Sequence, residues 1–191
     1  MANEISENKI EERGDAILLS DLRYSEVLAQ FEDVVGKEFM FDFGDIFVYR
    51  TAVTNPPTDF DTMPNHRKEE LESGIPYEFQ FNPEDVAEME YQEKKDQVTK
   101  EAMSVHETEE LVKSEAIKYY ERVKAKYGEE AAELYVLKRG RYIMRLHITP
   151  EVAAISGFSK KTGHANVLLK RGITIKDILD TDYGITEFSY N

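Results

Sequence analysis

The chain has 191 residues, a length typical of one domain with an appendage. Its 24 Lys and Arg residues are outnumbered by 38 Asp and Glu residues, and the formal net charge is −14. This charge argues against direct nucleic-acid binding over the general surface, because neutralising phosphates requires clustered basic side chains. The absence of cysteine excludes disulfides, thiolate metal sites and a cysteine nucleophile. No apolar run approaches the ~20 residues of a membrane span, and no signal peptide is visible, so we expect a cytoplasmic protein that does not enter a membrane.

The charge is unevenly distributed along the chain. Residues 134–191 carry nine basic and five acidic side chains, a net charge of +4, which leaves −18 on residues 1–133. Such an asymmetry is typical of an acidic helical layer over a mildly basic sheet, or of a basic surface that holds an anionic ligand. The sequence leaves both interpretations open.

The first 45 residues are predicted to contain one helix and one strand. Residues 1–20 are polar and acidic without a hydrophobic period, and we expect a loose arm there, followed by a single domain at 21–191. Apolar side chains at helical spacing then predict a helix that ends at Gly36. Phenylalanines that alternate with charged or flexible residues over 39–43 predict a half-buried strand.

The middle of the chain combines a strand, an irregular segment and a charged helix. The apolar run 46–49, which ends at Arg50, predicts a buried central strand. Residues 54–65 are rich in Pro and Asn, which is typical of a loop. Asn82 followed by Pro83 is typical of a helix start, and the helix that it opens carries many charges.

The C-terminal half predicts one helix followed by strands. Apolar residues at helical spacing place the helix at 107–127, and Gly128 ends it. After a short segment at 129–134, the expected strands are 142–148, 166–169, one around Ile173, Ile175 and Ile178, and 185–190. Helices followed by mostly consecutive strands predict an α+β fold with a mostly antiparallel sheet and N-terminal and central helices. We expect the C-terminal strands to share one sheet with the strand that ends at Arg50.

Several short patterns match known sites but lack the residues that would complete them. Asp42-Phe43-Gly44 spells the magnesium triplet of kinases without the Gly-rich loop or the catalytic loop. Residues 180–184 begin like a calcium loop, but the glycine comes one place early and no glutamate occupies the twelfth position. The four histidines have no ligand spacing and no cysteine to join them. We therefore predict no metal site.

Three segments, in order along the chain, resemble the ADP-ribosyltransferase family. The first, residues 46–51, is similar to the family's strand that ends in an arginine. The resemblance implies that Arg50 holds the phosphates of NAD, and a guanidinium fork can bind a pyrophosphate bidentately.

The second segment, residues 102–108, is similar to the family's serine-containing strand. Ser104 fits the first hydroxyl position, and His106 replaces the second, so the resemblance implies that both contribute to the NAD site. An alternative for Ser104 is a helix cap, with Glu107 completing a capping box.

The third segment, residues 141–172, resembles the family's C-terminal core and includes a loop at 156–165 that would face a target. The family places its catalytic glutamate just before the apolar strand of this core. Asn166 stands at that position here, and His164 stands where the upstream partner usually lies, so these two are the catalytic candidates. An amide offers no negative charge to a cationic ribose, which implies weak or lost transfer. Asn166 is equally suited to a hydrogen bond in the turn after Gly163.

The resemblance implies a protein that binds NAD and modifies a protein target, for which a basic surface is one expectation. Two other functions stay open. One is a non-enzymatic acidic interaction protein that binds a basic partner or mimics nucleic acid through residues 1–133. The other is a structural or assembly component of a phage. ADP-ribosyltransferase-like proteins of this small acidic kind occur in phages and mobile elements, which is an analogy to the family and not a property of these residues.

Overall fold

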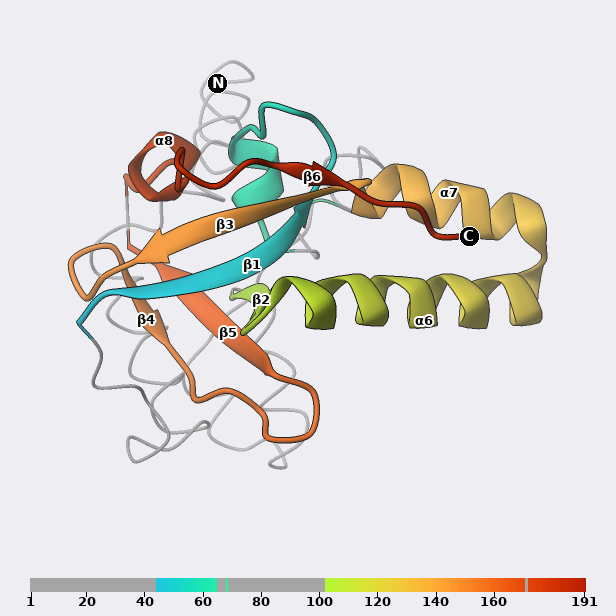
Figure 1. The fold of residues 1–191 in the computed structure, drawn as a ribbon, viewed down its shortest axis with the longest axis horizontal. Helices are drawn as coiled ribbons and strands as arrows, with labels where there is room; N and C mark the ends of the chain where they lie inside the picture. The colour runs from blue at the N-terminus through green and yellow to red at the C-terminus, as the bar shows by residue number, and fades with distance from the viewer. Residues whose placement is uncertain (1–43, 65–67, 69–101, 171) are drawn as a thin grey trace, which may run out of the picture.

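The computed structural model describes residues 44–64, 68, 102–170 and 172–191. Its centre is a curved six-stranded sheet with the order β4-β5-β2-β1-β3-β6, in which neighbouring strands run antiparallel (Figure 1). The strands are β1 (Ile46–Ala52), β2 (Met103–His106), β3 (Tyr142–Ile148), β4 (Ala153–Ile155), β5 (His164–Leu169) and β6 (Thr186–Glu187). The α+β class and the mostly antiparallel sheet predicted from the sequence are confirmed.

The two sides of β1 are paired very differently. Seven residues of β1 pair in register with β3, from Ile46 opposite Ile148 to Ala52 opposite Tyr142. Toward β2, the described strands share the single register pair Tyr49 and His106. The sheet is therefore closed between β1 and β3 and opens between β1 and β2.

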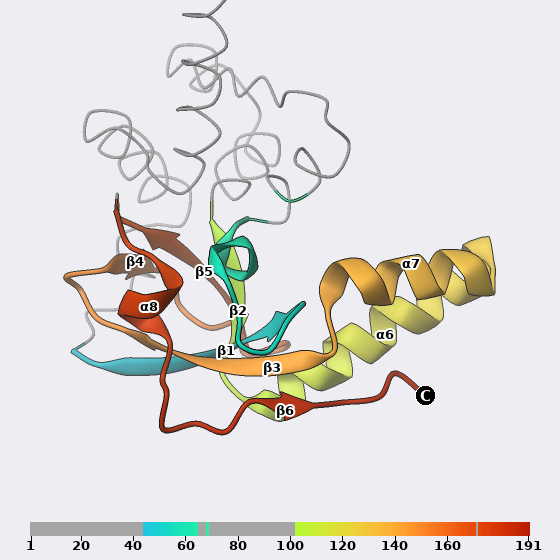
Figure 2. The same ribbon diagram turned by 90° about the horizontal axis from the view of Figure 1, so that it is seen from above.

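Two apolar clusters pack on opposite faces of the sheet. Alternation along β1 directs Val48 and Ala52 into the larger cluster, and Tyr49 packs against the smaller one. The short helices η2 (Asp59–Thr62) and α8 (Ile175–Ile178) lie together on the side of the larger cluster, where the backbone N–H of Ile175 donates to Asp59 Oδ1 at 2.8 Å (Figure 2). Most of the core strands are thus buried on both faces.

A helical hairpin, α6 (Glu109–Tyr127) and α7 (Glu129–Arg139), extends from the end of the sheet (Figure 1). The side chain of Thr108 caps α6 by accepting from the N–H of Leu111. Gly128 joins the helices with a φ of 93°. Gly140 ends α7 with a φ of 92°, and a Cβ there would lie 2.0 Å from the carbonyl oxygen of Ala52. Only glycine fits this approach of α7 to the end of β1.

An aromatic group closes the space between the hairpin and the C-terminal segment. Tyr190 contacts Tyr120 of α6, Tyr135 of α7 and Phe188, with ring centroids 4.8–6.2 Å apart. The hydroxyl of Tyr190 donates to the carbonyl of Gly140 at 2.8 Å. This aromatic group fixes the hairpin to the chain that follows β6.

Several predicted elements need correction. The segment around Ile173, Ile175 and Ile178 is not a strand: α8 forms there, because Thr174 and Asp177 make a capping box. Residues 129–139 form a full helix and not a short segment. The terminal strand is confined to Thr186–Glu187, although it does join the sheet beside β3. The expected arm, the helix ending at Gly36, the strand at 39–43 and the helix opened by Asn82 lie outside the described residues.

Candidate functional site

Three neighbouring strands bring the predicted site residues together. Strands β5, β2 and β1 are adjacent in the sheet. Ser104 lies opposite Asn166, and His106 lies opposite His164. Residues that face each other in an antiparallel pair project from the same side of the sheet. The four side chains therefore share one face.

Arg50 lies at the opening between β1 and β2 and is 5% exposed. Its guanidinium donates three hydrogen bonds to backbone carbonyls: Nε to Asp61 at 2.8 Å, Nη1 to Ser104 at 2.6 Å and Nη2 to Met63 at 2.7 Å. These bonds use three of the five N–H donors of the side chain. Arg50 thus joins β1, β2 and the η2 segment, and the Ser104 carbonyl accepts the bond from Nη1.

The charge of Arg50 is held in a buried setting. Burial lowers its pKa to about 9, with a further lowering from the charge of Arg139, while Asp61 acts in the opposite direction. Asp61 is itself fully buried, and its carboxylate accepts from the backbone N–H groups of Val53 and Thr58 at 2.7 and 2.9 Å. The carboxylate therefore holds the loop after β1 in place beside the arginine.

Ser104 contacts His164 across the β2–β5 pair. The distance between Ser104 Oγ and His164 Nε2 is 2.5 Å. Burial lowers the pKa of His164, and the neighbouring charges of His106 and Arg139 lower it further, although Glu115 opposes them. At neutral pH the imidazole is uncharged and can accept the serine proton. Ser104 does not cap the following helix with Glu107, because Thr108 occupies the cap.

His106 contacts the helical hairpin as well as β5. Its Nε2 lies in close contact with the Glu115 carboxylate of α6, and Arg139 Nη2 lies 3.8 Å from the same carboxylate oxygen. Burial acts to raise the pKa of Glu115, but the hydrogen bond from His106 and the charges of His106 and Arg139 outweigh it, so the pKa is lowered. The ring of His106 also meets His164 edge to face, with centroids 5.5 Å apart.

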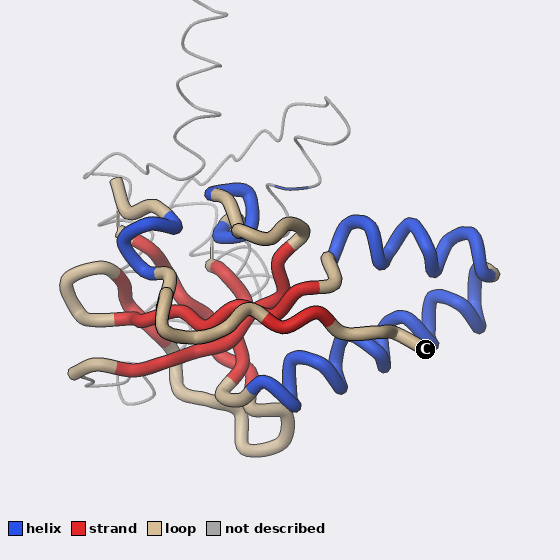
Figure 3. Tube along the Cα trace, turned by 45° about the horizontal axis from the view of Figure 1, so that its top comes forward, coloured by secondary structure: helices blue, strands red, loops and turns tan. Residues whose placement is uncertain are grey.

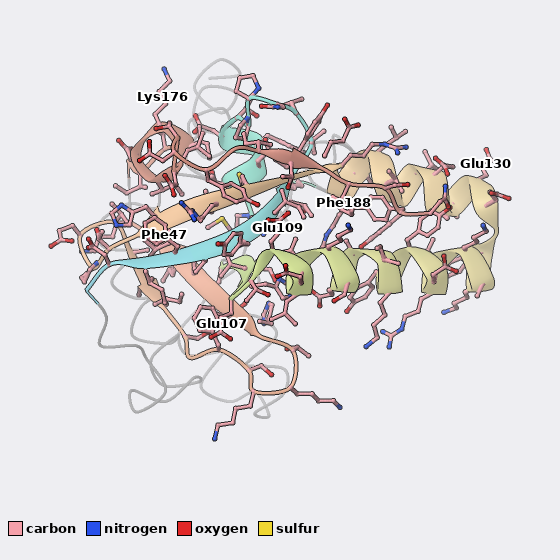
Figure 4. The ribbon with its side chains drawn as sticks, viewed as in Figure 1. Phe47, Glu107, Glu109, Glu130, Lys176 and Phe188 are labelled. Carbon is pink, nitrogen blue, oxygen red and sulfur yellow. The ribbon has the colours of Figure 1, made fainter. Side chains whose placement is uncertain are left out.

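Sequence reasoning missed Glu115 and Arg139. A weak signal was present, since Glu115 follows the buried Val112 by three residues and so lies on the inner side of α6. Arg139 lies beyond the short segment predicted at 129–134, and it reaches Glu115 because α7 extends to Arg139 and folds back along α6. Figure 4 labels Glu109 in the first turn of α6 and Glu107 just before the helix.

Asn166 takes part in the backbone of the β4–β5 hairpin. Its N–H donates to Ser156 Oγ at 2.9 Å, and its carbonyl accepts from the Ser156 N–H at 3.0 Å. Asn166 does not begin β5, which starts at His164. The loop before β5, predicted to face a target, connects β4 to β5 at the edge of the sheet (Figure 3). Gly163 in this loop has a φ of 63° and accepts from the Glu107 N–H at 2.9 Å.

A small pocket lies beside these residues, between the β1–β2 opening and α7. Its cavity measures about 20 Å³, and one water needs ~10–15 Å³, so it accommodates one water-sized group and not a dinucleotide. The lining side chains are mostly cationic or polar: Arg50, Thr51, Lys68, Ser104, His106, Val112, Lys138 and Arg139. The pocket joins Arg50, Ser104 and His106, whereas His164 and Asn166 do not line it.

Comparisons with known proteins found no match: no family model, no curated protein and no solved structure corresponds to this chain. Within the described residues, no group of three or more His, Asp or Glu side chains is arranged to hold a metal ion. In the same part of the chain, no helix is long and apolar enough to cross a membrane.

Proposed function

We propose that the chain is an ADP-ribosyltransferase-like protein that binds NAD, with weak or lost transfer to a protein target. One observation carries the proposal. Arg50 donates to the backbone carbonyl of Ser104, and Ser104 Oγ contacts His164, which links β1, β2 and β5 although the bonded residues are 54 and 60 positions apart in sequence. Because Tyr49 pairs with His106, the Arg50 side chain reaches this carbonyl from the face of the sheet opposite the Ser104 and His164 side chains. The resemblance requires these three segments to meet, and no local pattern in the sequence demands it.

Arg50 acts as a positioning residue in this proposal. Its bonds to three carbonyls hold the opening between β1 and β2, so Ser104 and His106 stand at the rim of the pocket. In this proposal the groups around Arg50 bind the phosphates, and not Arg50 itself. The three carbonyl bonds account for the burial of Arg50, which lies inside β1 and not at its end.

Weak transfer follows from the charges near His164. Cleavage of the glycosidic bond of NAD develops positive charge on the ribose, and a preorganised carboxylate stabilises that charge. The β5 positions that face Ser104 and His106 carry Asn166 and His164, which have no negative charge at neutral pH. The Glu115 carboxylate contacts His106 and Arg139.

Calorimetry with NAD tests the binding step. We expect measurable heat with the wild type and roughly tenfold weaker binding for Ser104→Ala, since losing one hydrogen bond at a site costs about 1–1.5 kcal/mol. Ser114→Ala is the matched control, because Ser114 is exposed on α6. Absence of heat at millimolar NAD would reject the proposal.

Labelled NAD tests the transfer step. Asn166→Glu and His164→Glu each place a carboxylate on the face that carries Ser104, and we expect at least one to raise automodification by on the order of 10²-fold. Asn166→Gln is the control that lengthens the side chain without adding charge. Efficient transfer by the wild type, or no gain from either glutamate, would show that this face is not a transferase centre.

A second candidate is a non-enzymatic interaction protein. It is favoured by apolar side chains exposed on the hairpin: Tyr127 is 65%, Leu134 54% and Leu137 67% exposed. Replacing Leu134 and Leu137 with Ser should abolish association with a partner while leaving NAD binding unchanged. A pull-down that is insensitive to these changes would remove this candidate.

A further inference from the structure

The pocket beside α7 concentrates positive charge from three separate parts of the chain. Arg50 comes from β1, Lys68 follows the η2 segment, and Lys138 and Arg139 form the last turn of α7. Ser104 and His106 of β2 add a hydroxyl and an imidazole to the same lining. Cations gathered in a concave, partly enclosed space favour a negatively charged ligand.

Two carboxylates near the pocket, Glu115 and Asp61, have partners of their own. Glu115 is shared between His106 and Arg139. Asp61 uses its oxygens on the backbone N–H groups of Val53 and Thr58. The repulsion among the cations is felt at Arg50, whose pKa the charge of Arg139 helps to lower. A bound anion would relieve that repulsion.

Arg139 carries a further sign of a ligand. Its Nε is buried, and among the residues that the structure describes it has no hydrogen-bond partner. Buried donors are normally satisfied, because leaving one unpaired is unfavourable. Basic residues in the last turn of a helix also complement the helix dipole. That effect explains the presence of Lys138 and Arg139 but not a buried, unpaired Nε beside other cations.

We propose that this pocket binds an oxyanion of the phosphate class, with Lys138 and Arg139 of α7 as the principal cations and Ser104 and His106 as additional polar groups. The inference rests on the proposed function, because Ser104 belongs to both sites, and it assigns phosphate recognition to α7 and not to Arg50. The cavity of about 20 Å³ admits one oxygen of the anion while the remainder stays at the opening. Both free phosphate and the pyrophosphate of a dinucleotide present this chemistry.

Calorimetric titration of the full chain with inorganic phosphate, pyrophosphate and NAD, in buffer of constant ionic strength, tests the proposal. The test variant is Lys138→Gln combined with Arg139→Gln. The matched control is Lys113→Gln combined with Lys118→Gln, which removes the same charge from the exposed side of α6. We expect the test variant to bind pyrophosphate at least tenfold more weakly than the wild type, since charge-assisted bonds are about twice as strong as neutral ones, and the control to bind as the wild type does.

The outcomes separate the two proposals. Phosphate or pyrophosphate binding that depends on Lys138 and Arg139, without NAD binding, supports the anion site and rejects the proposed function. NAD binding that is unchanged in the test variant rejects the anion site and supports the proposed function. Equal weakening in the test and control variants, or no anion binding by the wild type, overturns the anion site. Arg139→Lys keeps the charge, and should restore most of the binding if the full variant folds poorly.

Discussion

The two sides of β1 differ in how they pair with the neighbouring strands. Toward β3, all seven residues of β1 pair in register. Toward β2, the described strands share one register pair, and the guanidinium of Arg50 donates to the carbonyl of Ser104 on β2. The closed side builds the core, and the open side carries the polar cluster. Where two neighbouring strands pair at one position only, the sheet leaves space for a site and backbone groups that side chains can bind.

We expect the largest effect on stability from replacing Arg50, which joins β1, β2 and the η2 segment. Arg50→Met removes three charge-assisted hydrogen bonds and leaves Asp61 without its cation, so we expect a loss of about 3–5 kcal/mol in the free energy of unfolding. Urea denaturation measures this change. Arg141→Met is the control, because its ion pair with Glu133 spans 3.9 Å between half-exposed side chains and should contribute less than ~1 kcal/mol. Equal losses in the two variants would mean that Arg50 does not hold the opening.

An intermediate effect is expected where α7 meets the end of β1. Gly140→Ala adds a Cβ within 2.0 Å of the Ala52 carbonyl at a positive φ, and we expect a loss of about 3 kcal/mol. Gly128→Ala has a similar φ of 93° but nothing within 4 Å of the new Cβ, and its cost should be only about 1–2 kcal/mol. Thermal unfolding of both variants measures the difference, which is the contribution of the close approach alone. Similar melting temperatures would indicate that α7 moves away without cost.

The smallest effect concerns the pH dependence of the polar cluster. The pKa of His164 is lowered from 6.5 by burial and by the nearby His106, Arg139 and Arg50, with Glu115 opposing. A lowered pKa in the folded state means that the unfolded chain takes up the proton first. The contribution to stability is therefore present above pH 6.5 and is lost as the pH falls through the folded value.

His164→Gln removes this titration, and unfolding free energies measured from pH 7.5 to pH 5 should fall less steeply than those of the wild type. His147→Gln is the matched control, because His147 lies on β3 outside the cluster, with a side chain that is 39% exposed. If the two variants show the same pH dependence, His164 does not titrate within the cluster.

Sequence reasoning succeeded where local pattern and tertiary structure agree. The run from Ile46 to Tyr49 is apolar throughout and the segment 142–148 is mostly apolar, and strands are found at both places. The helix at 107–127 is also found, starting two residues later at Glu109. Periodicity and a strong glycine stop were sufficient for these elements, because burial on the expected faces decides them.

The failures have physical reasons. Ile175 and Ile178 are spaced three apart, which suits a helical turn as well as a strand, and the cap at Thr174 decides in favour of the turn. Gly128 was taken as the end of helical structure, although a glycine at positive φ can also join two helices. The meeting of Arg50 with Ser104 followed from the order of three segments, but Glu115 of α6 contacts His106, and Arg139 reaches Glu115 because α7 folds back along α6. Such long-range contacts leave no trace in local spacing.

The aromatic group between the hairpin and the C-terminal segment also gives the protein an optical signal of its own. The chain has 11 tyrosines and no tryptophan, so its near-ultraviolet absorption and fluorescence come from tyrosine. Tyr120 and Tyr190 are almost fully buried and lie in ring contact, a setting that yields a strong circular dichroism band. That band reports whether α6, α7 and the segment after β6 are docked. Far-ultraviolet spectra, which sum over all helices and strands, would remain nearly unchanged if this junction alone came apart.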